Sequence, residues 1–366
     1  MKQGWEIKKL GDVATILDSQ RKPVTKKDRC NGIYPYYGAS GVQDYVDKYI
    51  FDGRYLLVGE DGAKWGASDK SAYIVDGKCW VNNHAHILKL DNSINDKMVE
   101  YYLVYKDLSE YITGAIVPKL TQQALKQIPI PVPEREEQER IVGELDCLSG
   151  IIAAKRAQLR ELDTLAQSIF YTMFGDPITN DKGWQTKKLG DVALIVGGST
   201  PSTREETNWN GDLNWVTPAE LNGTLYYGET QRKITTEGAR GLELLPVGTV
   251  LLSSRAPIGK LAITTVPMYC NQGFKNVVCG ESINNIYVYY YLLATIENVK
   301  ALGVGATFKE VSKRAVENYH ILVPPIDLQK QFAEKIENIE RQKELITKSI
   351  KETEDLFNSR MDYYFN

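Results

Sequence analysis

The sequence has little cysteine, little histidine and no long apolar run, and each shortage excludes a class of protein. No apolar stretch approaches the ~20 residues that a membrane-spanning helix needs, and residues 1–12 lack the apolar core of a secretory signal. The five cysteines stand singly and never in C-x-x-C spacing, which argues against a disulfide scaffold or a zinc ribbon. We therefore expect a cytoplasmic protein that binds no membrane.

Motifs of common catalytic sites are also missing. The sequence contains no G-x-x-x-x-G-K-[ST] loop, no G-x-G-x-x-G turn and no H-E-x-x-H helix, and it lacks the Asn/Asp-Pro-Pro-aromatic motif of amino-methyltransferases. His84 and His86 could share one face of a strand, but no third metal ligand is indicated nearby. We expect no catalytic residues, no bound metal and no cofactor of the chain's own, which disfavours a single-chain nuclease or methyltransferase.

Charge is nearly balanced, with 44 Lys and Arg against 47 Asp and Glu, so the chain is no generally basic coat for nucleic acid. The acidic excess lies on residues 134–174, with 5 basic and 8 acidic groups, and on residues 326–366, with 7 and 9. The remaining segments are neutral to slightly basic. We expect any contact with a polyanion on those segments.

An internal repeat organises the chain. Residues 5–16 and 184–195 are identical at nine of twelve positions, at an offset of 179. Further on, at an offset of 191, Ile130-Pro-Val-Pro133 matches Ile321-Leu-Val-Pro324, and Gln138 matches Gln329. The residues between these landmarks differ between the copies. This pattern predicts one scaffold that carries two different recognition surfaces.

Each copy ends in a heptad pattern, in which apolar residues follow one another at alternating steps of four and three. The expected seam residues are Ile141, Leu145, Leu148, Ile152, Leu159 and Leu162 in the first copy, and Phe332, Ile336, Ile339, Ile346 and Ile350 in the second. Each helix would have ~40 residues and measure about 60 Å. Packing of each stripe on its own domain is the alternative, but such helices overhang a ~130-residue domain, so we expect an antiparallel coiled coil.

The globular segments read as α+β, because short β-branched runs with Gly and Asp at their ends alternate with Tyr-rich helical patterns. The expected order is a first recognition domain at 1–133, a central long helix at 134–174 and a linker at 175–183. A second recognition domain at 184–325 and a distal helix at 326–366 complete the chain.

This order resembles the DNA-specificity subunit of type I restriction-modification systems. The resemblance covers essentially the whole chain and rests on the helix start IPIPVPEREEQERIV, the FGDP linker and the GWxxKKLGDVA restart. The domain interiors resemble two different classes of target recognition domain, through YPYYG, FDGRYLLVGEDG and VNNHAH in the first and LSSRAPIG and NQGFK in the second. One departure is Leu328, which stands where the first copy has Glu137.

The resemblance implies a subunit without catalytic activity that reads a split target in double-stranded DNA, with one half-site for each domain. It also implies two methyltransferase (modification) subunits and restriction subunits as partners. S-adenosylmethionine and ATP would belong to those partners.

The heptads agree with this architecture on physical grounds. Antiparallel pairing of helices from tandem repeats creates a pseudo-two-fold axis, which suits the approximate dyads of DNA, and helix length then acts as a ruler for the spacer. Ile152 corresponds to Lys343 and Lys155 to Ile346. This exchange of apolar and polar positions favours pairing of the two unlike helices, although lysines at any coil end would give the same pattern.

Residues expected to contact DNA combine donors for base edges with groups for phosphates. In the second domain they are Arg255, Gln272, Lys275, Thr200 and Arg204; in the first they are Tyr36, Tyr37, Lys64, Asn83, His84, Lys22 and Lys26. Each has a structural alternative: carbonyl binding for Arg255, turn formation for Gln272 and Lys275, core packing for the tyrosines, and solvation for the basic run at 21–27. A rival function is a coiled-coil adaptor with two protein-binding heads and no DNA target.

Overall fold

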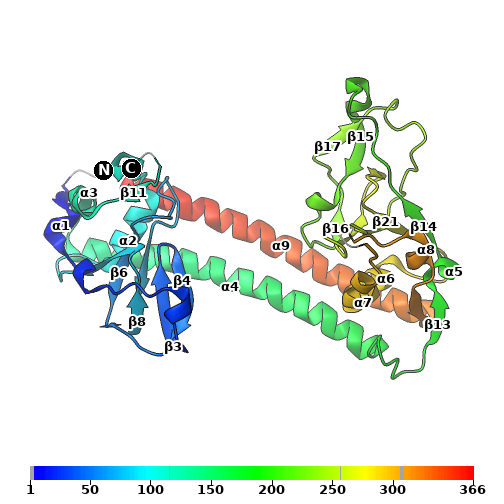
Figure 1. Cartoon of the computed structure of the whole chain (residues 1–366), viewed down its shortest axis with the longest axis horizontal. Helices are drawn as coiled ribbons and strands as arrows, with labels where there is room; N and C mark the ends of the chain where they lie inside the picture. Colours follow the sequence, from blue (N-terminus) through cyan, green and yellow to red (C-terminus); the bar gives the residue numbers. More distant parts are fainter. Residues whose placement is uncertain (1–3, 115, 256, 306–308) are drawn as a thin grey trace. The chain divides into compact units, whose positions relative to one another are not determined.

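A computed structural model describes residues 4–114, 116–255, 257–305 and 309–366, and it divides the chain into two compact units. The first unit comprises residues 1–156 and 347–366, and the second comprises residues 157–346. Each unit therefore contains one globular domain, the first half of the long helix that follows it, and the last part of the other long helix (Figure 1).

The first unit contains two four-stranded sheets and two strand pairs. One sheet has the order β2-β9-β6-β7, and the other has the order β4-β3-β8-β5, in which β3 and β8 are parallel. In the first sheet, β2 is Ala14–Ile16, β9 is Ala85–Leu90, β6 is Tyr55–Gly59 and β7 is Ala72–Val75. In the second sheet, β4 is Gly41–Val46, β3 is Asn31–Gly38, β8 is Lys78–Val81 and β5 is Phe51–Asp52. The pairs are β1 (Glu6–Lys9) with β12 (Pro129–Val132) and β10 (Ile112–Thr113) with β11 (Lys119–Leu120).

Short helices close this unit. Helix α2 (Asp96–Tyr105) begins after Asn95, whose side chain accepts a hydrogen bond from the Lys97 amide, and α3 (Gln122–Gln127) begins after Thr121, which accepts from the Ala124 amide. Helix α1 is Leu10–Val13, and single 3-10 turns are Asp18–Gln20, Lys26–Asp28 and Ser109–Tyr111.

The second unit repeats this plan. Its main sheet has the order β14-β21-β18-β19-β16, and a smaller sheet has the order β17-β15-β20. In the main sheet, β14 is Ala193–Gly197, β21 is Lys275–Cys279, β18 is Val250–Leu252, β19 is Leu261–Thr264 and β16 is Tyr226–Tyr227. In the smaller sheet, β17 is Arg232–Ile234, β15 is Trp209–Val216 and β20 is Tyr269–Cys270. Strand β13 (Gln185–Lys188) pairs with β22 (His320–Val323) as β1 pairs with β12. The helices are α5 (Leu189–Val192), α6 (Asn285–Ala294), α7 (Ile296–Ala301) and α8 (Lys313–Glu317), with 3-10 turns at Glu206–Asn208 and Pro218–Glu220.

The long helices are α4 (Arg135–Phe174) and α9 (Ile326–Phe365), and they pair antiparallel within each unit. In the first unit, Arg360 donates to Glu144 at 3.0 Å, and Lys155 Nζ donates to Ser349 Oγ at 2.6 Å. In the second unit, Lys343 Nζ lies 2.8 Å from Asp163. Since positions that rise along α4 meet positions that fall along α9, the predicted antiparallel coiled coil of an α+β chain is confirmed.

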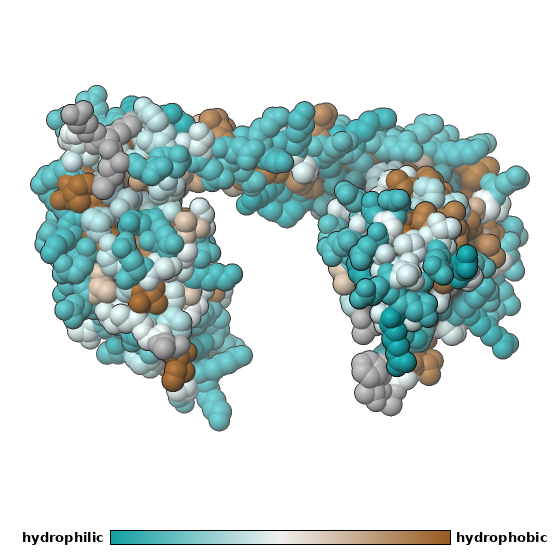
Figure 2. Space-filling view, turned by 90° about the horizontal axis from the view of Figure 1, so that it is seen from above, coloured by the Kyte–Doolittle hydropathy of each residue, from teal (hydrophilic) through white to brown (hydrophobic). Residues whose placement is uncertain are grey.

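Burial along the predicted seam is strongest where the helices meet the globular domains. Ile141, Leu145, Phe332 and Ile336 have no exposed surface, and Ile339 and Ile350 are also buried. The remaining predicted seam residues are half-buried: Leu148, Ile152, Leu159, Leu162 and Ile346. The face of the long helices that Figure 2 shows is mostly hydrophilic. No helix of the described residues is both long and apolar enough to cross a membrane.

Each core is completed by the end of the other repeat's helix. In the first unit, Met361, Tyr364 and Phe365 from α9 join Ile141 and Leu145 from α4. In the second, Ala166, Phe170 and Phe174 from α4 join Phe332 and Ile336 from α9. Aromatic contacts fix these ends, because Phe365 lies 5.6 Å from the Tyr102 ring and Phe174 lies 4.8 Å from the Tyr287 ring. Burial of one such side chain contributes about 1.5–3 kcal/mol.

A buried glutamine holds the start of each long helix in the same way. The Gln138 side chain accepts from the Asn95 amide at 2.6 Å and donates to the Pro133 carbonyl at 2.8 Å. Gln329, at the offset of 191, accepts from the Asn284 amide at 2.8 Å and donates to the Pro324 carbonyl at 2.8 Å. The two helix starts are therefore equivalent, despite Leu328 in place of a glutamate.

We predict that Gln329→Ala lowers the free energy of unfolding by about 1–3 kcal/mol, because it leaves the half-buried Asn284 amide and the buried Pro324 carbonyl without this partner. Thermal melting followed by circular dichroism would measure the loss. Gln158→Ala, at an exposed position of α4, is the matched control and should change stability by less than about 0.5 kcal/mol. Equal melting temperatures for both variants would contradict this role of Gln329.

Candidate nucleic-acid interface

In both units, the same two backbone hydrogen bonds join three equivalent segments of the chain. In the first unit, the Glu60 amide donates to the His84 carbonyl at 2.9 Å, and the Glu60 carbonyl accepts from the Leu120 amide at 2.8 Å. In the second, the Ser254 amide donates to the Gly273 carbonyl at 2.7 Å, and the Ser254 carbonyl accepts from the Val311 amide at 2.9 Å. Glu60 and Ser254 are thus equivalent positions.

An asparagine turn lies beside each of these positions. The Asn82 side chain accepts from the His84 amide at 2.8 Å, and the Asn271 side chain accepts from the Gly273 amide at 2.9 Å. The backbone amides of these asparagines donate to the ends of β3 and β15. Asn83 and Gln272, both predicted to contact DNA, therefore occupy the same exposed place in their units. We call the surface around residues 60–64, 82–84 and 119 in the first unit, and 254–255, 271–273 and 310 in the second, the strand-end surface.

In the second unit an ion-pair group lies on the strand-end surface. Arg255 Nε lies 2.9 Å from Glu310, and Lys275 Nζ lies 3.3 Å from the other oxygen of the same carboxylate. Burial alone would raise the pKa of Glu310, but the hydrogen bonds from Arg255 and Lys275 outweigh burial and hold this pKa below its ordinary value. Glu310 therefore stays ionised between two cations.

The surroundings of Lys275 do not favour the predicted contact with DNA. Its side chain is only 13% exposed, and its ammonium also donates to Ser254 Oγ at 3.3 Å and to the Gln272 carbonyl at 3.5 Å. With Glu310 these acceptors meet all three ammonium donors. Lys275 thus supports the turn from beneath, which is the structural alternative considered for it.

The other predicted residues of this domain remain accessible. Arg255 is 49% exposed, and Gln272 and Arg204 are exposed. The Thr200 hydroxyl donates to the Gln272 side chain, so the structure brings these two predicted residues together.

In the first unit, Tyr36 does not fit a DNA contact. Its side chain is 1% exposed, its hydroxyl hydrogen-bonds to the Val24 carbonyl at 3.3 Å, and the Arg29 guanidinium lies 4.2 Å from its ring. Tyr36 packs inside the domain because alternate residues of β3 point inward. Tyr37 is half-buried against the Tyr73 ring at 5.9 Å.

The remaining predicted residues of the first domain are exposed. Lys64, Asn83 and His84 lie on the strand-end surface, and the His84 ring hydrogen-bonds to Asp61. Lys22 and Lys26 are exposed on the segment before β3. These side chains keep the accessibility that DNA contact requires.

Beneath this surface lies a buried ionic cluster that the sequence did not indicate. Asp18, Glu60 and His86 bring ligand-type atoms within 4.8 Å of one another. Arg21 lies 2.6 Å from Glu60, and Lys119 lies 2.7 Å from its other oxygen. The residues do not fit a metal ion, because these cations already neutralise the carboxylates.

The cluster holds the turn that carries Asn83. Arg21 also donates to the Ala85 carbonyl at 2.7 Å, while His86 meets Asp18 at 2.6 Å and the Leu120 carbonyl at 2.7 Å. His86 is thus engaged through both ring nitrogens and does not form a ligand pair with exposed His84. These contacts join residues up to 68 positions apart, which explains why no local motif revealed them.

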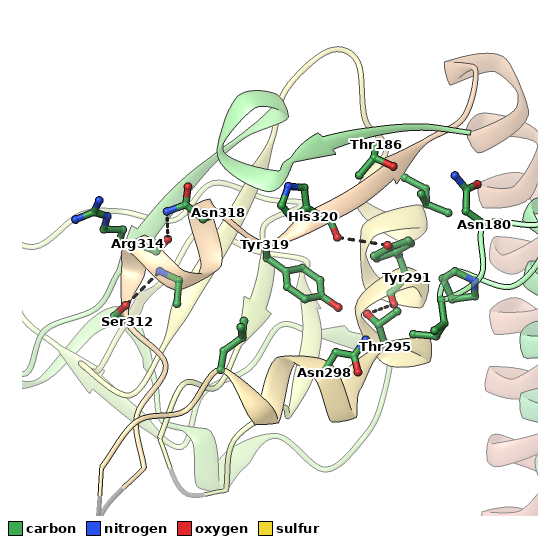
Figure 3. Close-up of a pocket in the computed structure, with 15 residues that line it drawn as sticks. Asn180, Thr186, Tyr291, Thr295, Asn298, Ser312, Arg314, Asn318, Tyr319 and His320 are labelled. Atoms are coloured by element: carbon green, nitrogen blue, oxygen red, sulfur yellow. Dashed lines mark hydrogen bonds between the residues drawn. The ribbon is translucent and has the colours of Figure 1, made fainter. Parts of the chain in front are cut away.

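An open pocket of about 660 Å³ lies elsewhere on the second unit (Figure 3). Polar side chains line much of it, including Asn298, Asn318 and His320. The Tyr291 hydroxyl donates to the His320 carbonyl at 3.4 Å, so the pocket wall is tied to β22. None of the predicted DNA-contacting residues is among its described lining residues. The pocket is therefore distinct from the strand-end surface.

We predict that the ionic cluster makes the first unit sensitive to acid. Burial alone would raise the pKa of Glu60, but Lys119 and Arg21 hold it below the ordinary 4.5. A lowered pKa in the folded state contributes stability that is present above pH 4.5 and is lost as pH falls through the folded value. Glu60→Gln should lower the free energy of unfolding at pH 7 by about 1–3 kcal/mol.

The melting temperatures of the wild type and Glu60→Gln should then converge as pH falls below 4.5, because glutamine does not titrate. Glu136→Gln, at an exposed position of α4, is the matched control. A difference between wild type and Glu60→Gln that stays constant down to the acid transition would contradict the prediction.

Comparison with known proteins places both domains in one family. The model of the "Type I restriction modification DNA specificity domain" matches residues 2–163 and again residues 181–355. A type I restriction enzyme specificity subunit of Methanocaldococcus jannaschii, MjaIX, is 34% identical over 180 residues, which are 46% of this chain and 42% of that protein. A Haemophilus influenzae protein described as a specificity subunit of the same enzyme type is 26% identical over 98% of this chain and 94% of its own.

A solved structure shares the fold along the whole chain. The S subunit of a type I restriction-modification system from M. genitalium superposes with a TM-score of 0.60 at 13% identity, covering 99% of this chain and 97% of that one. At this identity the likeness concerns the fold alone. Because the family model matches most of the chain, twice and in tandem, the chain belongs to the type I restriction-modification DNA specificity family and is a DNA sequence-specificity subunit.

Proposed function

We propose that the chain reads a two-part target in double-stranded DNA, with one half-site for each recognition domain and a spacer set by α4 and α9. We further propose that it holds two methyltransferase subunits and the restriction subunits, to which S-adenosylmethionine and ATP bind. The chain itself would carry no catalytic site.

The observation that carries this proposal is the pair of equivalent strand-end surfaces with different side chains. Asn83 in the first unit and Gln272 in the second stand on equivalent turns, and both are amides of the kind that bind adenine through N6 and N7. Close by, the first unit presents Asp61 and His84, while the second presents Arg255. A shared frame with different donors and acceptors is what the reading of two unlike half-sites requires.

The exchange of helix ends supports a two-part target. Phe170 and Phe174 of α4 correspond, at the offset of 191, to Met361 and Phe365 of α9. Each repeat gives its helix end to the other repeat's core, so the two cores are completed in the same reciprocal way. This reciprocity supports a target of two parts, one for each domain.

Partner subunits are proposed from the family. The relatives are named as specificity subunits of type I restriction enzymes, so a specificity subunit of the same family should assemble with the remaining subunits. The alternative of an adaptor without a DNA target is not favoured by membership in a DNA specificity family.

The direct test is a map of methylated adenines in the host genome, with and without this gene. Loss of methylation at a two-part motif with a fixed spacer, on deletion of the gene, is the expected result. Complementation with the wild-type gene should restore the same motif. Unchanged methylation, in cells where the chain co-purifies with a methyltransferase, would contradict the proposed function.

We predict that removal of one heptad from each long helix, residues 153–159 and 346–352, shortens the preferred spacer. The two segments face one another, since Lys155 Nζ donates to Ser349 Oγ at 2.6 Å. Seven residues correspond to about 10.5 Å of helix, or about three base pairs at 3.4 Å each. Methylation mapping in a strain that carries the variant gene would read the new spacer.

Deletion of residues 153–159 alone is the control for that experiment, because it shifts one helix against the other and should abolish methylation through misfolding. A doubly deleted protein that folds and still selects the original spacer would exclude a ruler made by the helices.

A further inference from the structure

Only one side of the Arg255 guanidinium contacts Glu310. Its Nε lies 2.9 Å from Glu310, whereas its two terminal nitrogens have no hydrogen-bond partner among the described residues. Terminal nitrogens of an arginine form a planar fork of donors, which matches the O6 and N7 acceptors of guanine in the major groove. The half of the guanidinium suited to guanine is therefore the half without a hydrogen-bond partner among the described residues, on a side chain that is 49% exposed.

Glu310 is itself immobilised from several sides. Its backbone exchanges two hydrogen bonds of 3.1 Å with Val304, and it forms a β-bridge with Arg255. Its second carboxylate oxygen lies 3.3 Å from Lys275, which is 13% exposed. A carboxylate fixed in this way restricts the rotation of Arg255 before any ligand arrives, so less side-chain freedom is lost on binding.

The same bridge in the first unit has the opposite charges. Asp61 pairs with Lys119 where Arg255 pairs with Glu310, and both bridges follow the equivalent backbone contacts of Glu60 and Ser254. The same backbone hydrogen bonds form with either order of charges at these two positions. Folding therefore does not require one particular order. This pair of positions is free to differ between domains that read different bases.

We propose that Glu310 is a positioning residue that presents the fork of Arg255 to a guanine in the half-site read by the second recognition domain. The inference rests on the proposed function and adds to it the base that one position of that half-site must carry. Lys275 acts behind Glu310, as the cation that keeps this carboxylate ionised and in place.

The test is selection of duplexes from a randomised library by the purified full-length chain, together with any subunits that co-purify. The wild type should prefer guanine at one position of one half-site by roughly ten- to hundred-fold. Arg255→Lys keeps the charge but removes the fork, and it should abolish this preference. Glu310→Ala should reduce it several-fold, and Glu310→Gln, which keeps one acceptor oxygen, should reduce it less.

Lys309→Ala, at the exposed neighbour of Glu310, is the matched control and should leave every preference unchanged. The half-site read by the first domain is a control within the same experiment, because a merely structural defect would affect both half-sites. If Glu310→Ala fails to fold in a melting experiment, Arg255→Lys alone decides the guanine assignment, and Glu310→Gln decides the role of Glu310.

Two results would overturn this inference while leaving the proposed function intact. Variants that select the same bases as the wild type would exclude guanine reading by Arg255. Variants that weaken binding equally on every sequence would make Arg255 a phosphate contact. A wild type that selects no two-part target at all would instead refute the proposed function, and the inference with it.

Discussion

The structure depends on the burial of each long helix's end in the core of the other repeat. Phe170 and Phe174 of α4 lie among residues of the second domain, and Met361, Tyr364 and Phe365 of α9 lie among residues of the first. Apolar surfaces of this size would remain in water if either helix were shortened or detached. Each core is therefore incomplete without a segment that is remote in sequence and belongs to the other repeat.

This exchange also constrains helix length. From Ile141 to Phe174 the chain advances by 33 residues (174 − 141), and from Phe332 to Phe365 it again advances by 33 (365 − 332). An antiparallel pair buried at both ends needs equal spans, about 50 Å here at 1.5 Å per residue. Between the anchors the seam is only half-buried, at Ile152, Leu159 and Ile346. Length, more than tight packing in the middle, is thus the property that the cores enforce.

The sequence predicted those features that depend on periodic or repeated local patterns. The heptads predicted two helices and their pairing, and the offset of 191 predicted the equivalence of Gln138 and Gln329. It could not predict contacts that only the tertiary fold creates. Glu310 meets Lys275 across 35 residues, and Glu60 meets Arg21 across 39. The inward direction of Tyr36 and the saturated ammonium of Lys275 likewise follow from strand register and turn geometry, which no local motif encodes.

Comparison of the two units shows which features of the strand-end surface are common to both and which differ. His86 of β9 and Lys275 of β21 lie two residues after the equivalent positions His84 and Gly273, and both meet an acidic side chain, at 3.6 and 3.3 Å. A basic side chain at this place is common to both units. The acidic partners differ: in the first unit they are Asp18, at 2.6 Å, and Glu60, at 3.6 Å, whereas in the second unit the partner is Glu310, the equivalent of Lys119. The acidic residues lie beneath the strand-end surface in the first unit, whereas Glu310 lies on that surface in the second. This difference leaves the backbone hydrogen bonds unchanged but alters which charged side chains are exposed. A fold of this kind can change its recognition chemistry without rebuilding its core, because the acidic partner of this basic side chain can come from different positions around the same backbone hydrogen bonds.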